Sequence, residues 1–333
     1  MTKLTTFANL TKKVAFPAGV IILIGIFVIL IVLKFIGIKE TSDLPQLARP
    51  QIESLPPVAL NFIAGSLSPP KDAPKKLPVF KISPGDNFLA RSKSLANRFG
   101  LNQKPTEVND IDLGKGLIYS NQPETLIIYS QQFNYLKSTR KSPEGSLEIN
   151  LLKEKALDLL KELDLSSISP NDKIIYSQLS GESSIVVTDP LLADQATLVF
   201  NYKLNDYTLL AASGGLKLTY NAAGNLINFA AYARPEYSQL EFYPIISFKK
   251  AFDNLKKTKG TLIEITGNRE DLSSLKTLGP VSLTKAYLSY YLPAKTPEIL
   301  QPFWVFEGKG QQLKTEFSTI FVVPAVEDQF FKD

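Results

Sequence analysis

The chain has 333 residues and none of them is cysteine or histidine, so a disulfide framework, a thiolate nucleophile, a Ser-His-Asp triad and an ordinary zinc site are excluded. Of 37 basic and 32 acidic residues, five lysines and no acid fall in the first 39 positions. Residues 40–333 are therefore formally neutral and lack the positive charge that nucleic-acid binding requires.

The first predicted element is an uncharged run of twenty residues, Val14–Leu33. A helix of this length covers the hydrocarbon core of a bilayer, about 30 Å, and satisfies its own backbone groups. Pro17 falls in the first turn, where a missing N–H costs little, and Gly19 and Gly25 permit close approach of another helix. Lys34 follows the run without a small-residue cleavage site. We therefore predict an uncleaved signal-anchor in preference to a cleaved signal peptide.

The orientation of this anchor follows from its flanks. Lysines lie on both sides, but the front is only thirteen residues long and a long chain trails behind, which favours a cytoplasmic N-terminus. The missing cysteines agree with an oxidising outer side. We predict a single-pass protein of the cytoplasmic membrane, with a cytoplasmic tail at 1–13, a transmembrane signal-anchor at 14–38 and the C-terminal domain outside.

A Pro-rich spacer is predicted at 39–77, since nine prolines fall between positions 41 and 84. Proline fixes φ and removes a backbone donor, so the spacer is expected to be extended and to hold the folded part away from the membrane. A ligand for a proline-binding domain is the alternative. The apolar segment 58–64 inside the spacer is either docked or interfacial.

A membrane-proximal folded unit is predicted at 78–170. It opens with a short edge strand, Pro78–Ile82, because proline is tolerated at the start of such a strand. A helix over about 86–100 and strands within 117–136 follow. A second helix ends near Leu163, where apolar residues recur at helical spacing. That apolar face consists of Leu152, Ala156, Leu159, Leu160 and Leu163.

A C-terminal unit is predicted at 171–333. Its clearest element is a hairpin of Leu216–Tyr220 and Ile227–Ala233, whose apolar residues alternate on both sides of a glycine-containing turn. A third helix is expected from Ser247 as N-cap to Gly260 as stop. Further strands are predicted at 174–179, 184–188, 196–202, 281–292, 303–307 and 316–325.

Together these elements predict an α+β fold. Helix followed by strands occurs three times, without a residue-level repeat. We expect an N-terminal transmembrane helix and then two α+β units of mostly antiparallel sheet, each sheet covered on one face by a helix.

Several stretches of the C-terminal unit resemble a known family. They are the hairpin start at 215–227, the helix start at 246–252, and the Tyr-rich strand at 286–291 that leads to Pro-aromatic residues at 300–306. Together with the anchor they resemble the YycH/YycI group of single-pass membrane proteins, which are built from PepSY-like α+β units.

The resemblance carries expectations about function. Members of that group lie outside the cytoplasmic membrane and adjust an essential sensor histidine kinase that controls cell-wall metabolism, partly through their transmembrane helices. A non-enzymatic regulatory or scaffolding role is implied here, with a membrane or envelope protein as partner and a sensor kinase as one candidate.

One motif in the sequence is typical of an enzyme. Ser247 and Lys250 form an S-x-x-K, in which the lysine can accept the serine proton one turn away. The companion motifs S-D-N and K-T-G are absent, and Ser247 also fits a helix N-cap. We therefore expect no catalytic residue. An extracytoplasmic acyl-serine or cell-wall-acting enzyme is the alternative, and a structural subunit of an envelope or secretion complex is another.

Metal and cofactor signals are similarly incomplete. Residues 110–114 resemble the start of a calcium loop, but the position that should carry the closing acid is Asn121. The stretches 114–116 and 308–310 do not extend into a phosphate-binding loop. We expect no metal, no cofactor and no small-molecule substrate.

Aromatic residues supply the candidate partner surface. If 281–292 is a strand, Tyr287 and Tyr291 share one face and Tyr290 takes the other. Tyrosine and tryptophan are favoured at contact hot spots, so Tyr287, Tyr291 and Trp304 are predicted to face a partner. A sheet face packed under a helix is the alternative.

Overall fold

The computed structural model describes residues 44–52, 62–63, 67–83, 85, 87–138, 145–165, 168–181, 183–187, 189–211, 215–266, 280–293, 297–312 and 315–332. Of these, 53% lie in strands and 16% in helices. The predicted anchor, including Pro17, Gly19, Gly25 and Lys34, falls outside them. Within the described part of the chain, no helix is both long enough and apolar enough to cross a bilayer.

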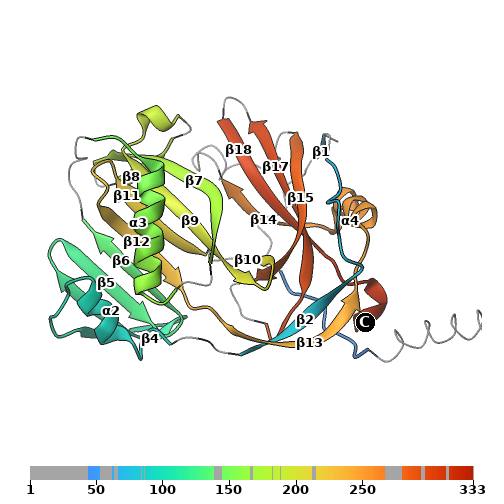
Figure 1. The fold of residues 1–333 in the computed structure, drawn as a ribbon, viewed down its shortest axis with the longest axis horizontal. Coiled ribbons are helices and arrows are strands. Elements are labelled where there is room, and N and C mark those ends of the chain that lie inside the picture. The colour runs from blue at the N-terminus through green and yellow to red at the C-terminus, as the bar shows by residue number, and fades with distance from the viewer. Residues whose placement is uncertain are drawn as a thin grey trace, which may run out of the picture. The chain divides into compact units, whose positions relative to one another are not determined.

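The helices are short and the strands numerous (Figure 1). The helical elements are α2 (Ser92–Arg98), α3 (Ile149–Glu162), α4 (Phe248–Asn254), the 3₁₀ turns η1 (Pro190–Leu192) and η3 (Asp328–Phe330), and the π turn η2 (Leu255–Lys259). The strands are β1 (Phe62–Ile63), β2 (Lys76–Ser83), β3 (Thr106–Asp110), β4 (Gly114–Asn121), β5 (Glu124–Tyr129), β6 (Gln132–Lys137), β7 (Ile168–Ser180), β8 (Ser183–Val186), β9 (Gln195–Leu204), β10 (Tyr207–Ala211), β11 (Leu216–Asn221), β12 (Leu226–Tyr232), β13 (Glu236–Pro244), β14 (Thr261–Thr266), β15 (Val281–Leu292), β16 (Ile299–Leu300), β17 (Pro302–Gln312) and β18 (Thr315–Pro324).

The predicted α+β class is wrong, because the described chain is mostly β-sheet. The first expected helix, at about 86–100, shrinks to the seven residues of α2. The third keeps its predicted bounds, from Ser247 as N-cap to Gly260, because α4 continues into the π turn η2. Six strands among the described residues, β1, β3, β10, β13, β14 and β16, were not expected. Strand β13 shows why: it is exposed along most of its length, so it lacks the alternation of buried and exposed residues by which strands are recognised.

One large sheet runs through both predicted units. It has fifteen strands among the described residues, and its main order is β14-β18-β17-β15-β10-β9-β11-β12-β6-β5-β4-β3. Most neighbours are antiparallel, but β10 lies parallel to β15, with Leu209 opposite Tyr290. Strand β12 pairs with β6, so strands from either side of residue 170 share hydrogen bonds.

Helix α3 covers one face of the part of this sheet that contains β6, β9, β11 and β12 (Figure 1). Its buried residues Leu152, Ala156 and Leu160 recur at helical spacing, as predicted, and pack into the larger core. Phe200 and Phe229 supply aromatic side chains from the sheet below. Burial of this apolar stripe is what holds a fourteen-residue helix in place.

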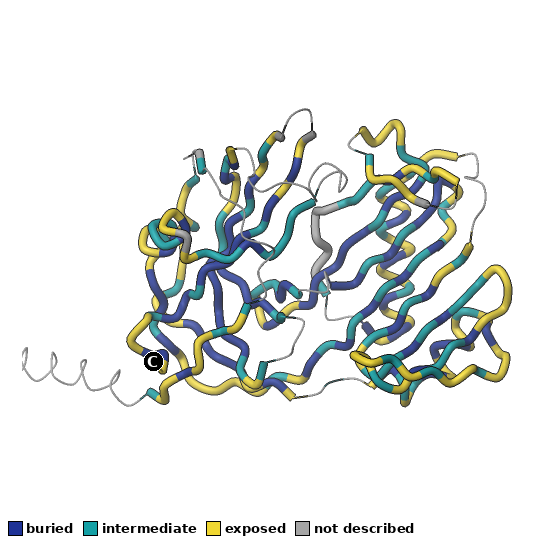
Figure 2. The backbone as a smooth tube through the Cα atoms, turned by 180° about the vertical axis from the view of Figure 1, so that it is seen from behind, coloured by how far each residue is buried: buried dark blue, intermediate teal, exposed yellow. Residues whose placement is uncertain are grey.

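A second core lies under α4. Ala251 and Leu255 pack with Trp304, Phe306 and Phe321 from β17 and β18. Figure 2 shows how burial varies along the strands: their middles are buried and the turns that join them are exposed.

The smaller sheet has the order β13-β2-β16. Strand β2 is therefore central, and the predicted edge position of Pro78–Ile82 is wrong. Pro78 is accommodated because the β13 register shifts between Gln239 and Phe242, and because β16 pairs only with Phe80 and Lys81 on the other side.

Part of the predicted spacer is packed against the fold. Phe62 pairs with Val281 in a parallel ladder, and its ring meets Phe321 edge-on at 5.2 Å. Residues 62–63 of the apolar segment 58–64 are thus docked. Residues 44–48 and 329–332 belong to a separate small unit, in which Leu47 forms a parallel bridge with Phe331.

Candidate functional site

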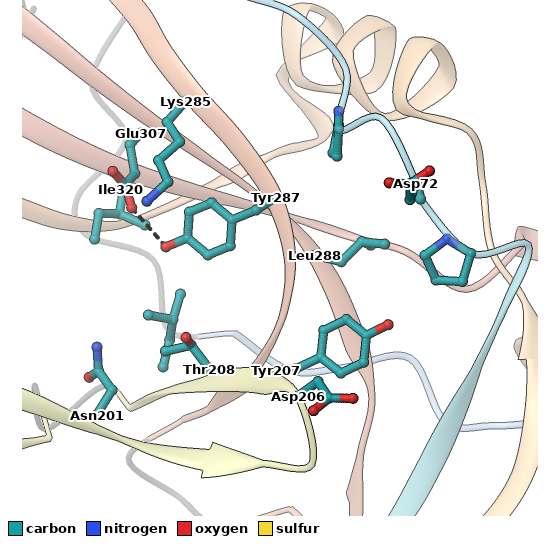
Figure 3. A pocket seen from close by; sticks show the side chains of 14 residues that line it. Asp72, Asn201, Asp206, Tyr207, Thr208, Lys285, Tyr287, Leu288, Glu307 and Ile320 are labelled. Carbon is teal, nitrogen blue, oxygen red and sulfur yellow. Dashed lines mark hydrogen bonds between the residues drawn. The ribbon is translucent and has the colours of Figure 1, made fainter. Parts of the chain in front are cut away.

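A pocket of about 500 Å³ opens where β9 and β10 meet β15, β17 and β18 (Figure 3). The turn at 70–74, from the predicted spacer, forms part of its wall. The parallel pairing of β10 with β15 places these strands side by side. The polar side chains that line the pocket are Asp72, Asn201, Asp206, Tyr207, Thr208, Lys285, Tyr287 and Glu307.

Tyr287 and Glu307 form the polar wall on β15 and β17. The Tyr287 hydroxyl donates to Glu307 Oε1 at 2.8 Å. Burial raises the pKa of Tyr287, and the Glu307 charge, its hydrogen bond and the Glu264 charge raise this pKa further. Lys285 lies directly opposite Glu307 in the ladder, and its ammonium sits 5.0 Å from the centre of the Tyr287 ring. Tyr287 is therefore a neutral hydrogen-bond donor, held between an acid and a base.

The β9–β10 hairpin forms the facing wall. Leu204 pairs with Tyr207 across a two-residue turn, in which Asn205 has a φ of 53° and Asp206 sits exposed at the tip. Burial raises the pKa of Tyr207, and the Asp206 charge adds to it. The Tyr207 ring meets Tyr290 edge-on at 5.9 Å, which fixes the hairpin against β15.

Asn201 is the most enclosed polar side chain of the pocket. It is 6% exposed and lines the pocket from β9, and its amide makes no hydrogen bond within the described residues. Gly215, with a φ of +72°, leaves room for it, since a Cβ there would lie 3.0 Å from Asn201 Oδ1 and would overlap the Phe200 carbonyl oxygen. The Asn201 amide thus lies at the pocket, and Gly215 is needed beside it.

The charge of the pocket is negative. Among the described residues of the lining, Asp72, Asp206 and Glu307 are three carboxylates against the ammonium of Lys285. In the described ranges, no group of three or more potential ligands is close enough to hold a metal ion.

The three residues of the predicted partner surface, Tyr287, Tyr291 and Trp304, do not lie on one exposed surface. Tyr287 and Tyr291 do share one face of β15, and Tyr290 takes the other. Tyr291 is only 4% exposed and Trp304 only 1%. Trp304 packs under α4, where its Nε1 donates to the Ile246 carbonyl oxygen at 2.9 Å. Of the three predicted residues, only Tyr287 reaches the pocket, because strand periodicity does not tell which face another layer covers.

The S-x-x-K motif has a structural explanation. The Ser247 hydroxyl oxygen accepts from the Lys250 backbone N–H at 3.3 Å, so Ser247 caps α4 as predicted. The calcium-like stretch is a polar turn between β3 and β4, where Asp110 Oδ1 accepts from the backbone N–H groups of Asp112 at 2.9 Å and Leu113 at 3.0 Å.

The sequence interpretation missed the other pocket residues. Asp206 carries a usable signal, since Asn-Asp between Leu204 and Tyr207 is typical of a tight hairpin turn. Asn201 and Glu307 carry none, because each is one polar residue of an alternating strand.

Comparisons with known proteins add little. No family model matches the chain, and no curated protein matches it. A solved structure of an uncharacterized protein from Eubacterium rectale is 12% identical, with a TM-score of 0.47 over 76% of this chain and 84% of that chain. A likeness of this degree shows neither a family nor a function.

Proposed function

We propose that the protein is a non-enzymatic, single-pass membrane protein that acts by contact. Anchored by Val14–Leu33 with its N-terminus in the cytoplasm, it holds a β-rich domain outside the membrane. That domain regulates or scaffolds an envelope partner, and a sensor histidine kinase is the candidate that the YycH/YycI resemblance suggests.

The chemistry of the pocket is the observation that carries this proposal. No serine, cysteine or histidine is found among the described residues that line it. The Tyr287 hydroxyl, one of the three hydroxyl groups in the described lining, has a raised pKa and donates a hydrogen bond to Glu307 Oε1. The donors and acceptors of the pocket are held in fixed positions on neighbouring strands, and this arrangement supports recognition of a partner.

Photo-crosslinking in native membranes tests the proposal. Probes replace Ile24 and Val28 in the anchor and Asp206 and Lys285 at the pocket, with Asp158 on the exposed side of α3 as a matched control. We expect an envelope protein to be captured from the pocket probes and not from Asp158. A sensor kinase captured from the anchor probes supports regulation, and adducts confined to envelope-assembly proteins support a scaffold.

The enzymatic alternative has its own test. An acyl-serine probe should leave the chain unlabelled. Labelling of the original chain that disappears in Ser247→Ala would overturn the non-enzymatic proposal, because such labelling would show that the Ser247 hydroxyl is reactive.

A further inference from the structure

We infer that the pocket between β10 and β15 binds an organic cation, a guanidinium or ammonium group. This inference rests on the proposed function, because an arginine or lysine side chain of the partner would present such a group. A free polyamine has the same chemistry, and the test below separates the two sources.

The charges of the pocket favour a cation. Asp72 and Asp206 are exposed at one wall and Glu307 is half-buried at the other. The one opposing charge in the described lining, Lys285, lies directly opposite Glu307 and over the Tyr287 ring. The tyrosines add no charge, because burial raises the pKa of Tyr207 and of Tyr287. A cationic ligand therefore meets an excess of two carboxylates in a partly enclosed space.

Asn201 supplies the second, independent observation. Its side chain is 6% exposed, lines the pocket and makes no hydrogen bond within the described residues. The amide atoms of Asn201 are accessible from the pocket, so Asn201 Oδ1 can accept a hydrogen bond from a ligand. Gly215 keeps the position of this amide open, since a Cβ at that site would crowd its oxygen. The carboxylates of the pocket accept hydrogen bonds as Asn201 Oδ1 does, so a ligand with several N–H donors can meet these acceptors together.

The arrangement suits an organic cation better than a metal ion. The described carboxylates do not converge into a metal-binding group. A guanidinium spreads its donors over a plane and can meet separated acceptors at once. Leu210, Leu288 and Ile320 add apolar wall, against which the aliphatic stem of arginine or lysine packs.

Calorimetric titration of the full-length chain in a non-ionic detergent tests the inference. The probes are N-acetyl-arginine methylamide, its neutral isostere N-acetyl-citrulline methylamide, and spermidine. We expect saturable one-to-one binding of the arginine compound and none of the citrulline compound. Asp206→Asn, at an exposed turn, should weaken binding at least tenfold, and Asn201→Leu should do the same. Asp158→Asn, on the exposed side of α3, should leave it unchanged.

The outcomes distinguish a partner side chain from a free polyamine, and some of them would overturn the inference. Spermidine that binds at least tenfold more tightly than the arginine compound identifies a free polyamine, and the reverse order identifies a partner side chain. Equal binding of the citrulline compound, an equal loss in Asp158→Asn, or no saturable binding of either cation overturns the inference. Crosslinks from Asp206 without cation binding would reject the inference alone. Cation binding without any crosslinked partner would reject the proposed function alone.

Discussion

The phenolic hydroxyl of Tyr290 donates to the carbonyl oxygen of Pro78 at 2.7 Å, across 212 positions of sequence. Tyr290 belongs to β15 of the large sheet and Pro78 to β2 of the small sheet. The Tyr290 side chain is fully buried, and its ring meets Phe80 edge-on at 5.3 Å. This pair is therefore a polar tie between the two sheets inside an apolar core.

Tyr290→Phe removes that tie without changing the ring. We expect the free energy of unfolding to fall by about 1–3 kcal/mol, because a buried acceptor loses a donor. Chemical denaturation measures the change. Tyr119→Phe is the matched control, since Tyr119 is 5% exposed and its hydroxyl makes no hydrogen bond within the described residues. Equal losses in the two variants would show that the Pro78 bond contributes nothing.

Gly215→Ala is expected to destabilise the chain more than Gly100→Ala. Both glycines have nearly the same positive φ, +72° and +73°, so both alanines carry a backbone cost of about 1–2 kcal/mol. Only at Gly215 would the new Cβ meet the Phe200 carbonyl oxygen, whereas nothing lies within 4 Å at Gly100. The difference between the two unfolding free energies isolates the steric term, and equal values would contradict the close approach beside Asn201.

Ser247→Ala should cost about 1 kcal/mol of stability through loss of the α4 cap. Ser247→Asp retains an acceptor for the Lys250 backbone N–H and should restore most of that loss. Thermal unfolding of both variants checks the prediction. A loss that Asp does not restore would mean that the hydroxyl has a role other than capping.

Alkaline pH should destabilise the fold from about pH 10 upward. Burial raises the pKa of Tyr220 and of Tyr290 above the ordinary value of 10.0. The unfolded chain releases these protons near pH 10 and the folded chain keeps them, so unfolding becomes easier as pH rises beyond that value. Below it, this contribution is constant.

Denaturant titrations across the alkaline range measure this effect. In Tyr220→Phe the fall in unfolding free energy with pH should be shallower, because one titrating group has been removed. A slope identical to that of the original chain would contradict the assignment of Tyr220.

Short-range patterns in the sequence predicted the hairpin of β11 and β12 and the helix α3. The hairpin of β11 and β12 was predictable because its apolar residues alternate and Gly224 takes a positive φ of +72° at the turn. Helix α3 was predictable because Leu152, Ala156 and Leu160 recur at helical spacing. Both depend on residues close together in the chain.

Long-range pairing was not predictable in the same way. The parallel contact of β10 with β15, which creates the pocket, joins residues about eighty positions apart and has no local signature. The predicted strand at 303–307 stops before Gly308 and Gly310, yet both lie inside β17. A Cβ at Gly308 would lie 2.5 Å from Val281 Cγ1, so the glycine is needed for close approach of two strands.

The central position of β2 has a consequence for folding order. Its partners β13 and β16 begin at Glu236 and Ile299, so β2 leaves the ribosome long before either exists. At roughly 5–20 residues per second, synthesis of the intervening chain takes on the order of ten to thirty seconds. During that interval Val79, Phe80 and Ile82, all buried in the finished fold, have no sheet to enter. The nascent chain thus carries an apolar segment without its sheet partners until β13 has been made, and a chain truncated before β13 never gains them.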